Sequence, residues 1–302
     1  MGFFSTIPSV VDNGIIWGIM AIGLFITYKI LDFADLTVDG SFATGGCTFA
    51  ILAFCGLPVP LALLIAFMAG MAAGLITALL HCYLGIPGIL AGILTQLMLW
   101  SINLKILGQS LLSINNRGSL ISLDMSLGVY TTIGIVGVIA IAVIALLYWF
   151  FGTKFGSSIR ATGANPDMAK ANGININSRK IVALMLSNGL VAFSGALYAQ
   201  FQGSAQTDMG RGAIVIGLAA IIIGTTLFSK LQKNFALSLA FVLVGSIIYF
   251  FVYQLIVFYT DEPELLKLLS AILVAIFLAI PYIKNVYVKN YQSKRQRVKE
   301  IE

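Results

Sequence analysis

The chain has 302 residues, of which 59% are hydrophobic and only 10% are charged, and its mean hydropathy is +0.97. Water-soluble globular domains carry about 25% charged residues, so this composition excludes a soluble globule and indicates an integral membrane protein. The length accommodates roughly eight to ten membrane helices of about 20 residues and leaves no room for a sizeable soluble domain. We therefore expect an all-α polytopic membrane helix bundle that forms a single domain over residues 1–302.

The net charge of +6 arises largely in two stretches, residues 152–180 and the tail at 284–302. Basic residues of membrane proteins concentrate on the cytoplasmic side, so membrane topology accounts for this charge. The sequence contains no basic patch interleaved with base-stacking aromatic residues. We therefore expect no nucleic-acid partner.

The sequence also lacks the residue sets that catalysis and metal binding require. Its single histidine, His81, is expected to be an interfacial packing residue rather than a proton relay. Cys47, Cys55 and Cys82 follow no metal-binding spacing and are expected to pack in apolar segments, so we predict no metal and no cofactor on this chain. The phosphate-binding pattern G-x-x-x-x-G-K-[ST] is missing, so another protein must hydrolyse any ATP. These features favour a transport subunit over an enzyme.

Apolar runs long enough to span a bilayer recur along the chain. The first has no basic region or small-residue cleavage site before it and has Lys29 at its end, so we expect it to remain as a helix with the N-terminus outside. About nine crossings then place the C-terminus in the cytoplasm, and residues 213–228 are barely long enough for about 30 Å of hydrocarbon. The predicted spans are residues 11–30, 36–55, 58–80, 86–104, 126–151, 181–201, 213–228, 235–259 and 265–283, with residues 105–124 and 202–212 outside and 229–234 inside.

One or two of these spans are expected to be broken helices. Breaks at membrane depth are tolerated only where the backbone faces protein or a water-filled cavity. Residues 212–228 are also rich in glycine, and two such segments fit a chain of two related halves around a central path. In the second span the predicted breaks lie at Asp39-Gly40 and Gly45-Gly46.

Polar side chains inside the spans are candidates for a translocation path. Thr37, Ser41, Thr44 and Thr48 recur at helical spacing and would form one hydroxyl stripe. These hydroxyls either line the path or bond to carbonyls of their own helix and to neighbouring helices. Gln96, at mid-depth in the fourth span, would cost several kcal/mol in hydrocarbon without a partner. We expect Gln96 to face the bundle interior, where it meets either substrate or another helix.

Residues 152–180 are the only long polar interval between two apolar runs of membrane length, and their excess of Lys and Arg places them in the cytoplasm. Asn165 can cap a short helix, Pro166 suits its first position, and Gly173 supplies a left-handed stop. This pattern predicts about two helical turns over residues 166–172. Because so short a helix is marginal in water alone, it packs either against a partner protein or only against its own chain.

The motif in this interval resembles the permease subunits of ATP-binding-cassette importers that serve branched-chain amino acids and simple sugars. It reads Arg160-x-x-Gly163-x-Asn165-Pro166-x-x-Ala169-x-x-x-Gly173-Ile174, and it is followed by Ser194-Gly195-Ala196 and Gly217-Leu218-Ala219. The runs LDFADLTVDGSFATGG and MGRGAIVIGLAAIIIG are similar to the branch associated with amino-acid uptake, including tryptophan and tyrosine. The resemblance covers about residues 11–281. It implies coupling to an ATPase through Arg160, Gly163, Asn165, Pro166, Asp167, Ala169 and Gly173.

The resemblance implies a multi-pass subunit of a bacterial plasma membrane, surrounded by the lipid bilayer. Its partners would be a cytoplasmic ATP-binding-cassette ATPase, an extracellular solute-binding lipoprotein and a second permease copy. Substrate would pass from the binding protein to the cytoplasm by alternating access. The alternative hypothesis is an ion-coupled secondary transporter, which needs a buried carboxylate near the midplane. Asp39 is the nearest candidate, but we expect Asp32, Asp35 and Asp39 to be solvated at the cytoplasmic mouth.

Overall fold

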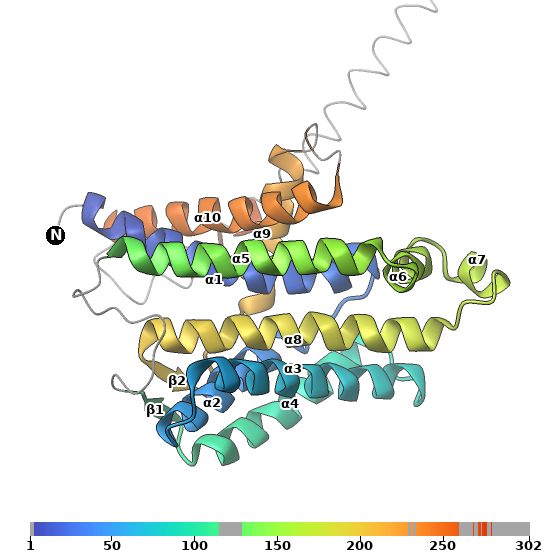
Figure 1. Cartoon of the computed structure of the whole chain (residues 1–302), viewed down its shortest axis with the longest axis horizontal. Coiled ribbons are helices and arrows are strands. Elements are labelled where there is room, and N and C mark those ends of the chain that lie inside the picture. Colours follow the sequence, from blue (N-terminus) through green and yellow to red (C-terminus); the bar gives the residue numbers. More distant parts are fainter. Residues whose placement is uncertain are drawn as a thin grey trace, which may run out of the picture.

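The computed structural model describes residues 3–114, 129–228, 231, 234–259 and, near the C-terminus, 268, 271–272, 274–276 and 279. Most of this part is helical (Figure 1). The helices are α1 (Phe3–Phe25), the π-helix η1 (Ile26–Ile30), α2 (Val38–Phe54), α3 (Val59–Cys82), α4 (Gly88–Leu107), α5 (Val129–Gly152), α6 (Lys154–Ala164), α7 (Pro166–Ala171), α8 (Ile176–Gln202), α9 (Ala213–Leu227) and α10 (Phe235–Tyr259). The strands are β1 (Leu111–Ser113) and β2 (Ser204–Gln206), which pair in antiparallel fashion.

Within the described part of the chain, six helices are long and apolar enough to cross a membrane, namely α1 continued by η1, α3, α4, α5, α8 and α10. The shorter apolar helices α2 and α9 have 17 and 15 residues. This arrangement confirms the predicted polytopic membrane helix bundle. The predicted span at 265–283 lies outside the described residues except for isolated helical positions, and the tail at 284–302 and residues 115–124 lie wholly outside them.

Helix α8 is the axis of the bundle. It packs against α1 on one side and against α2 and α3 on the other, so that α1, α5 and α10 form one group of helices and α2, α3 and α4 form another (Figure 1). In the most apolar 18-residue stretch of each helix, 67% of α8 is buried but only 22% of α5, which lies at the periphery of the bundle. A helix buried from both sides needs small residues for close approach, and the Ser194-Gly195-Ala196 run of α8 is fully buried.

The predicted breaks in the second span are wrong, because α2 is continuous from Val38 to Phe54. Its glycines permit close contact with α8 instead of interrupting the helix. A Cβ atom at Gly45 would overlap the backbone carbonyl of Ala192, and one at Gly195 would overlap the carbonyl oxygen of Phe42. The non-helical backbone lies before α2, between η1 and Val38, and there Asp32 adopts a positive φ of 53°. Helix α9 is also unbroken.

Helix α9 runs across the bundle at a steep angle to the long helices (Figure 1). Its first residues lie beside Asp39 of α2, Gly217 contacts α1 at Met20 and Leu24, and Gly224 contacts α10 at Phe241. The chain that leads into it, after β2, returns from the end of α8 to the start of α2. Residues 213–228 therefore form a helix as predicted, but the helix lies across the other helices because its small residues let it pass between them.

The prediction that the three clustered acids are solvated is wrong for Asp35, which is enclosed by protein, and holds only in part for Asp39, which is half-buried. Asp35 is 1% exposed and accepts hydrogen bonds from the Thr37 backbone N–H at 2.9 Å and from the Asn188 side chain at 2.7 Å. Asp39 accepts from the backbone N–H groups of Gly212 and Ile214, both at 2.9 Å. These donors replace water and satisfy the carboxylates. Only Asp32 is exposed as predicted.

Candidate functional site

The predicted caps of the short helix in the polar segment 152–180 are confirmed. The Asn165 side chain accepts a hydrogen bond from the Met168 backbone N–H at 3.0 Å, and Pro166 is the first residue of α7. Gly173 has a φ of +76°, the left-handed conformation that favours glycine. Helix α7 ends at Ala171, one residue earlier than predicted. The sequence therefore determines the local geometry of α7 by itself.

A second helix in this segment, α6, was not predicted and anchors α7 to the bundle. Thr153 caps its start by accepting from the Gly156 backbone N–H at 3.2 Å. Ile159 is fully buried, and a Cβ atom at Gly163 would overlap the carbonyl oxygen of Ile30 at the end of η1. Gly163 therefore permits contact between α6 and the first span.

Arg160 packs against aromatic rings of its own chain. Its guanidinium lies 4.1 Å from the ring centroid of Phe235, at the start of α10, and 5.4 Å from that of Phe151, at the end of α5. Partial burial lowers the pKa of this guanidinium from its usual value, yet the group remains a cation at neutral pH. Arg160 thus links α6 to two spanning helices by cation–π contacts.

Helix α7 projects from the end of the molecule, where one face of it is open (Figure 1). Pro166, Asp167 and Lys170 are exposed, and the apolar side chain of Met168 is 61% exposed. Ala169, in contrast, is 2% exposed and packs inward. The helix therefore contacts its own chain through one small residue and presents the rest of its surface outward.

The hydroxyl stripe of α2 is buried in helix contacts. The Oγ1 atoms of Thr37 and Thr77 lie 2.7 Å apart, and the Ser41 hydroxyl donates to Asn188 Oδ1 at 2.6 Å. Thr44 donates to the carbonyl of Gly40 at 2.9 Å, within its own helix. Thr48 is 9% exposed, and its hydroxyl has no hydrogen-bond partner. Three of the four hydroxyls thus make the kind of contact that stabilises helix packing.

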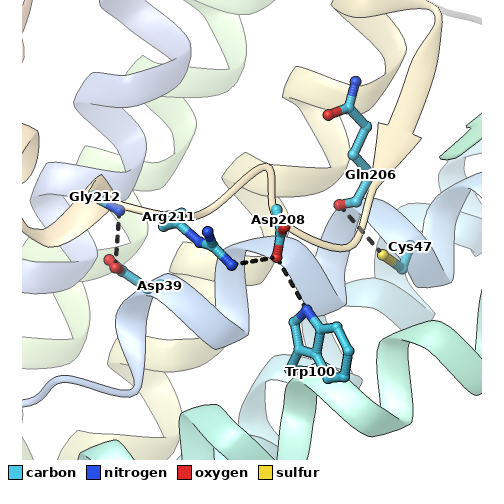
Figure 2. Close-up of polar contacts among 7 residues, drawn as sticks. All are labelled: Asp39, Cys47, Trp100, Gln206, Asp208, Arg211 and Gly212. Carbon is cyan, nitrogen blue, oxygen red and sulfur yellow. Dashed lines mark hydrogen bonds and ion pairs between the residues drawn. The ribbon is translucent and has the colours of Figure 1, made fainter. Parts of the chain in front are cut away.

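Gln96 lines a polar cavity of about 200 Å³ between α2, α4 and the chain that follows β2. Figure 2 shows the central contacts of this cavity. Asp208 accepts from the Trp100 indole N–H at 3.0 Å and forms an ion pair with Arg211 at 3.1 Å. The polar and aromatic residues that line this cavity are Asp39, Gln96, Trp100, Asn103, Asp208 and Arg211.

Asn103 is the most unusual residue of the polar cavity. Its side chain is fully buried, and among the described residues neither its amide nitrogen nor its amide oxygen has a hydrogen-bond partner. Leaving such a group unpaired costs about 1–3 kcal/mol, so buried amides of this kind normally meet a ligand, a water molecule or another side chain. Asn103 therefore gives the cavity an unused donor and acceptor.

A second cavity, of about 370 Å³, lies between α1, α8 and α10 and also includes Arg211 among its lining residues. Aromatic residues dominate its wall. The ring of Trp17 lies 5.5 Å from that of Tyr198 and 5.8 Å from that of Phe250, measured between centroids. Trp17 is 6% exposed, and its indole N–H has no hydrogen-bond partner in the part of the chain that the structure describes.

Of the five predicted path residues, the structure places Gln96 alone at the polar cavity, and sequence reasoning missed the residues around it. Asp208 and Arg211 were assigned to a short external loop, and Trp100 and Asn103 to the fourth span, without any link between the two segments. The two charged side chains in a loop otherwise rich in small residues are the signal that could have pointed to this site. The return of that loop to α2 is a tertiary feature that its composition does not reveal.

His81 is a packing residue, as predicted. Its Nδ1 lies 3.0 Å from the carbonyl oxygen of Ile86, and its Nε2 lies 3.2 Å from Lys180 Nζ. Its ring also makes an edge contact with Phe33, with centroids 5.0 Å apart. Among the described residues, no group of His, Cys, Asp or Glu side chains could hold a metal ion.

A polytopic bundle with polar cavities between its helices and a structured polar segment projecting from one end has the architecture of a membrane permease. The chain belongs to the family described as branched-chain amino acid transport system permease components, whose profile matches residues 7–280. This result confirms the resemblance in the sequence motif. The chain is thus a permease of the ATP-binding-cassette type. It is a transport subunit and a multi-pass membrane protein.

Relatives in this family differ in the substrates that their names record. The chain is 40% identical over 279 residues to a tyrosine transport system permease protein of Clostridioides difficile, a match that covers 91% of both chains. It is 34% identical to an uncharacterized Rickettsia prowazekii protein, with 86% of this chain and 92% of that one covered. It is also 29% identical to a galactose/methyl galactoside import permease of Escherichia coli, over 57% of this chain and 53% of that one.

A solved structure has the same fold. It is described as an inward-facing conformation of a metal-chelate type ABC transporter, and it matches with a TM-score of 0.52 over 92% of this chain and 84% of that chain. Because the identity is 14%, this likeness concerns the fold alone.

Proposed function

We propose that this chain is the membrane subunit of an importer for an amino acid, with aromatic amino acids favoured. The observation that carries the proposal is the α6–α7 segment, which is anchored to three spanning helices and presents α7 beyond the bundle. Such a segment can transmit movement between an external partner and the membrane helices. The tyrosine permease relative supports the substrate class.

The partner at α7 is a cytoplasmic ATP-binding-cassette ATPase. Asn165, Pro166 and Gly173 set the start and end of the helix, and Asp167 and Met168 present polar and apolar contacts to a cleft on that ATPase. Arg160, Gly163 and Ala169 hold the segment against its own chain. The seven residues of the coupling motif thereby divide into a docking group and an anchoring group.

The path for substrate runs beside Gln96, with α2 as one wall. The hydroxyl stripe lies on α2 and at its N-cap (Thr37, Ser41, Thr44 and Thr48) but does not line this cavity, and its place in the path stays a prediction. Substituting Gln96 by Leu should reduce substrate flux without reducing the amount of assembled transporter, because the residue contributes to a cavity rather than to the core. Normal uptake in both Gln96→Leu and Thr44→Leu would return these side chains to a packing role.

The remaining assembly follows from this function. An extracellular solute-binding lipoprotein delivers the substrate, and a second copy of the permease completes the path. With about nine crossings, the N-terminus lies outside and the α6–α7 end of the bundle lies in the cytoplasm. The membrane is the plasma membrane of a bacterium, consistent with the source of the relatives.

The test is reconstitution of the purified permease with its ATPase in liposomes, with the binding protein added outside. We expect uptake of radiolabelled tyrosine that requires ATP and all three proteins. An ion-coupled secondary transporter would behave differently, because the permease alone would accumulate substrate under a proton or sodium gradient. Such uptake without ATP would overturn the proposed function.

A further inference from the structure

Arg211 lines both the polar cavity and the aromatic cavity, so the two cavities adjoin at this residue. Its side chain is 74% exposed, and its ion pair with Asp208 is therefore of the exposed type, which contributes little to stability. Replacing Asp208 by the carboxylate of a ligand as the ion-pair partner of Arg211 therefore costs little free energy. Arg211 is thus free to take a ligand carboxylate, for which its planar fork is well suited.

The polar cavity offers every group that the backbone part of an amino acid requires. Arg211 can bind a carboxylate, Asp208 can accept from an ammonium group, and the unpartnered amide of Asn103 can bond to either. The volume of about 200 Å³ is below the range of roughly 300–1,000 Å³ that is usual for whole drug-sized ligands. The cavity therefore suits a small zwitterionic group better than a complete aromatic substrate.

The aromatic cavity provides the complementary surface. Trp17, Tyr198 and Phe250 can pack around an aromatic ring, for which edge and offset contacts are favourable. The buried indole N–H of Trp17 has no partner within the described ranges and can donate a hydrogen bond to a phenol oxygen. A tyrosine ring would satisfy this donor, whereas a phenylalanine ring would leave it unpaired.

We propose that the polar and aromatic cavities form one binding site for an aromatic amino acid. In this site Arg211, Asp208 and Asn103 bind the carboxylate and ammonium groups, and the cavity beside Trp17 holds the ring. The proposal rests on the proposed function and adds to it a location and a set of contacts for the substrate. Trp17 selects tyrosine over phenylalanine in this arrangement, because a site built for a hydroxyl group discriminates against the analogue that lacks it.

Equilibrium binding to the purified full-length permease in lipid nanodiscs tests the site without the ATPase or the binding protein. We expect saturable binding of radiolabelled tyrosine. Arg211→Gln should weaken tyrosine binding about tenfold or more, because a charged hydrogen bond is lost, and should leave the binding of tyramine, which has no carboxylate, within about twofold. Trp17→Phe should weaken tyrosine binding about five- to tenfold and change phenylalanine binding by less than about twofold.

Two variants control for charge and for aromatic substitution. Lys105→Gln removes one positive charge from an exposed position near the end of α4, and Trp149→Phe makes the same ring exchange at an exposed position on α5. Both should bind tyrosine like the unmodified protein. Asn103→Ala is expected to weaken tyrosine binding and phenylalanine binding to the same extent, since its amide contacts backbone groups that the two ligands share.

The proposal is overturned if tyrosine binding is not saturable, or if Arg211→Gln weakens tyrosine and tyramine equally. It is also overturned if radiolabelled galactose binds saturably and tyrosine does not displace it, which would mark a sugar site. ATP-dependent tyrosine uptake by the complete transporter is a separate measurement. If the Arg211→Gln variant takes up tyrosine with unaltered kinetics, this site is rejected and the proposed function stands. If tyrosine binds but is not taken up in an ATP-dependent way, the site is supported and the proposed function is rejected.

Discussion

The buried carboxylate of Asp35 shows how strongly single side chains can determine this fold. It accepts from Asn188, which in turn accepts from Ser41, so that a chain of side-chain hydrogen bonds joins the approach to α2, the helix α2 itself and α8. Buried polar networks are favourable only when each member is satisfied. Removal of the central amide therefore affects two partners at once.

At this position we predict that Asn188→Ala destabilises the protein by about 3 kcal/mol, because a buried carboxylate and a buried hydroxyl both lose a partner. The thermal unfolding midpoint in detergent should fall by several degrees. Ser157→Ala, at an exposed position of α6, provides the control and should leave the midpoint unchanged. If Asn188→Ala has the same unfolding midpoint as the Ser157→Ala control, water replaces the amide without loss of stability.

Gly173 is a second position where one residue type is required. Its φ of +76° is strained for any residue with a Cβ atom, although a Cβ there would meet no neighbouring atom within 4 Å. Gly173→Val should therefore redirect α7 without creating a steric clash. We predict that it lowers co-purification of the ATPase and ATP-dependent uptake, while the amount of folded permease is unchanged.

Gly152→Val is the matched control, since Gly152 does not have a positive φ and a Cβ atom there would also have open space. Its co-purified ATPase should equal that of the unmodified protein. Equal loss in both variants would mean that side-chain bulk in the segment, rather than the left-handed stop, disturbs docking.

At the level of elements, the glycines of α2 illustrate the difference between sequence pattern and tertiary contact. A glycine pair inside an apolar run fits both a broken helix and a close helix contact, and the sequence alone does not distinguish them. The structure places Gly45 directly against the backbone of Ala192 in α8. Glycine there permits an approach that lets two backbones pack without intervening side chains.

Gly45→Ala is accordingly expected to destabilise the bundle by at least about 1–3 kcal/mol, because one added methyl group would have to displace the backbone of α8. Gly137→Ala in α5 adds the same methyl group where no atom lies within 4 Å and should be neutral or slightly stabilising. Thermal unfolding in detergent compares the two. Equal midpoints would show that α2 and α8 can separate freely.

The long elements were predictable, and of the short elements only α7 was. Apolar length and terminal residues predicted α3, α4 and α8 to within about five residues, and residue chemistry predicted both caps of α7. Helix α6 was missed because its apolar residues are few, and its burial depends on η1 and Phe235. The candidate binding residues were missed because Trp100 and Asp208 meet only after α4 and the chain beyond β2 are placed together.

For the molecule as a whole, α8 and α9 connect the two groups of helices in different ways. Helix α8 lies lengthwise between them, whereas α9 passes from α2 across α1 to α10. Asp39 holds the start of α9 through two backbone N–H groups, where a carboxylate also complements the helix dipole. Movement of one group relative to the other would therefore act on the segment that carries Arg211 and Gly212, next to both cavities.

The orientation of this assembly in the membrane decides whether α7 can reach an ATPase. We predict that the α6–α7 end is cytoplasmic, because the segment 152–180 carries several basic residues, and that the β1–β2 end faces outward. In a protein whose native cysteines are replaced, Ser157→Cys on α6 should resist a membrane-impermeant thiol reagent in intact cells and react after the cells are opened. Ser110→Cys, which is exposed beside β1, should react in intact cells.

Ser293→Cys extends the same experiment to the tail at 284–302, which should be protected together with Ser157→Cys if the last predicted span is present. If Ser157→Cys is protected but Ser293→Cys is labelled, the number of membrane crossings differs from the prediction. Helix α7 would still lie in the cytoplasm and could contact the ATPase. Labelling of Ser157→Cys from outside would instead remove α7 from the cytoplasm and with it the proposed coupling, because charged segments of this length do not cross the hydrocarbon region spontaneously.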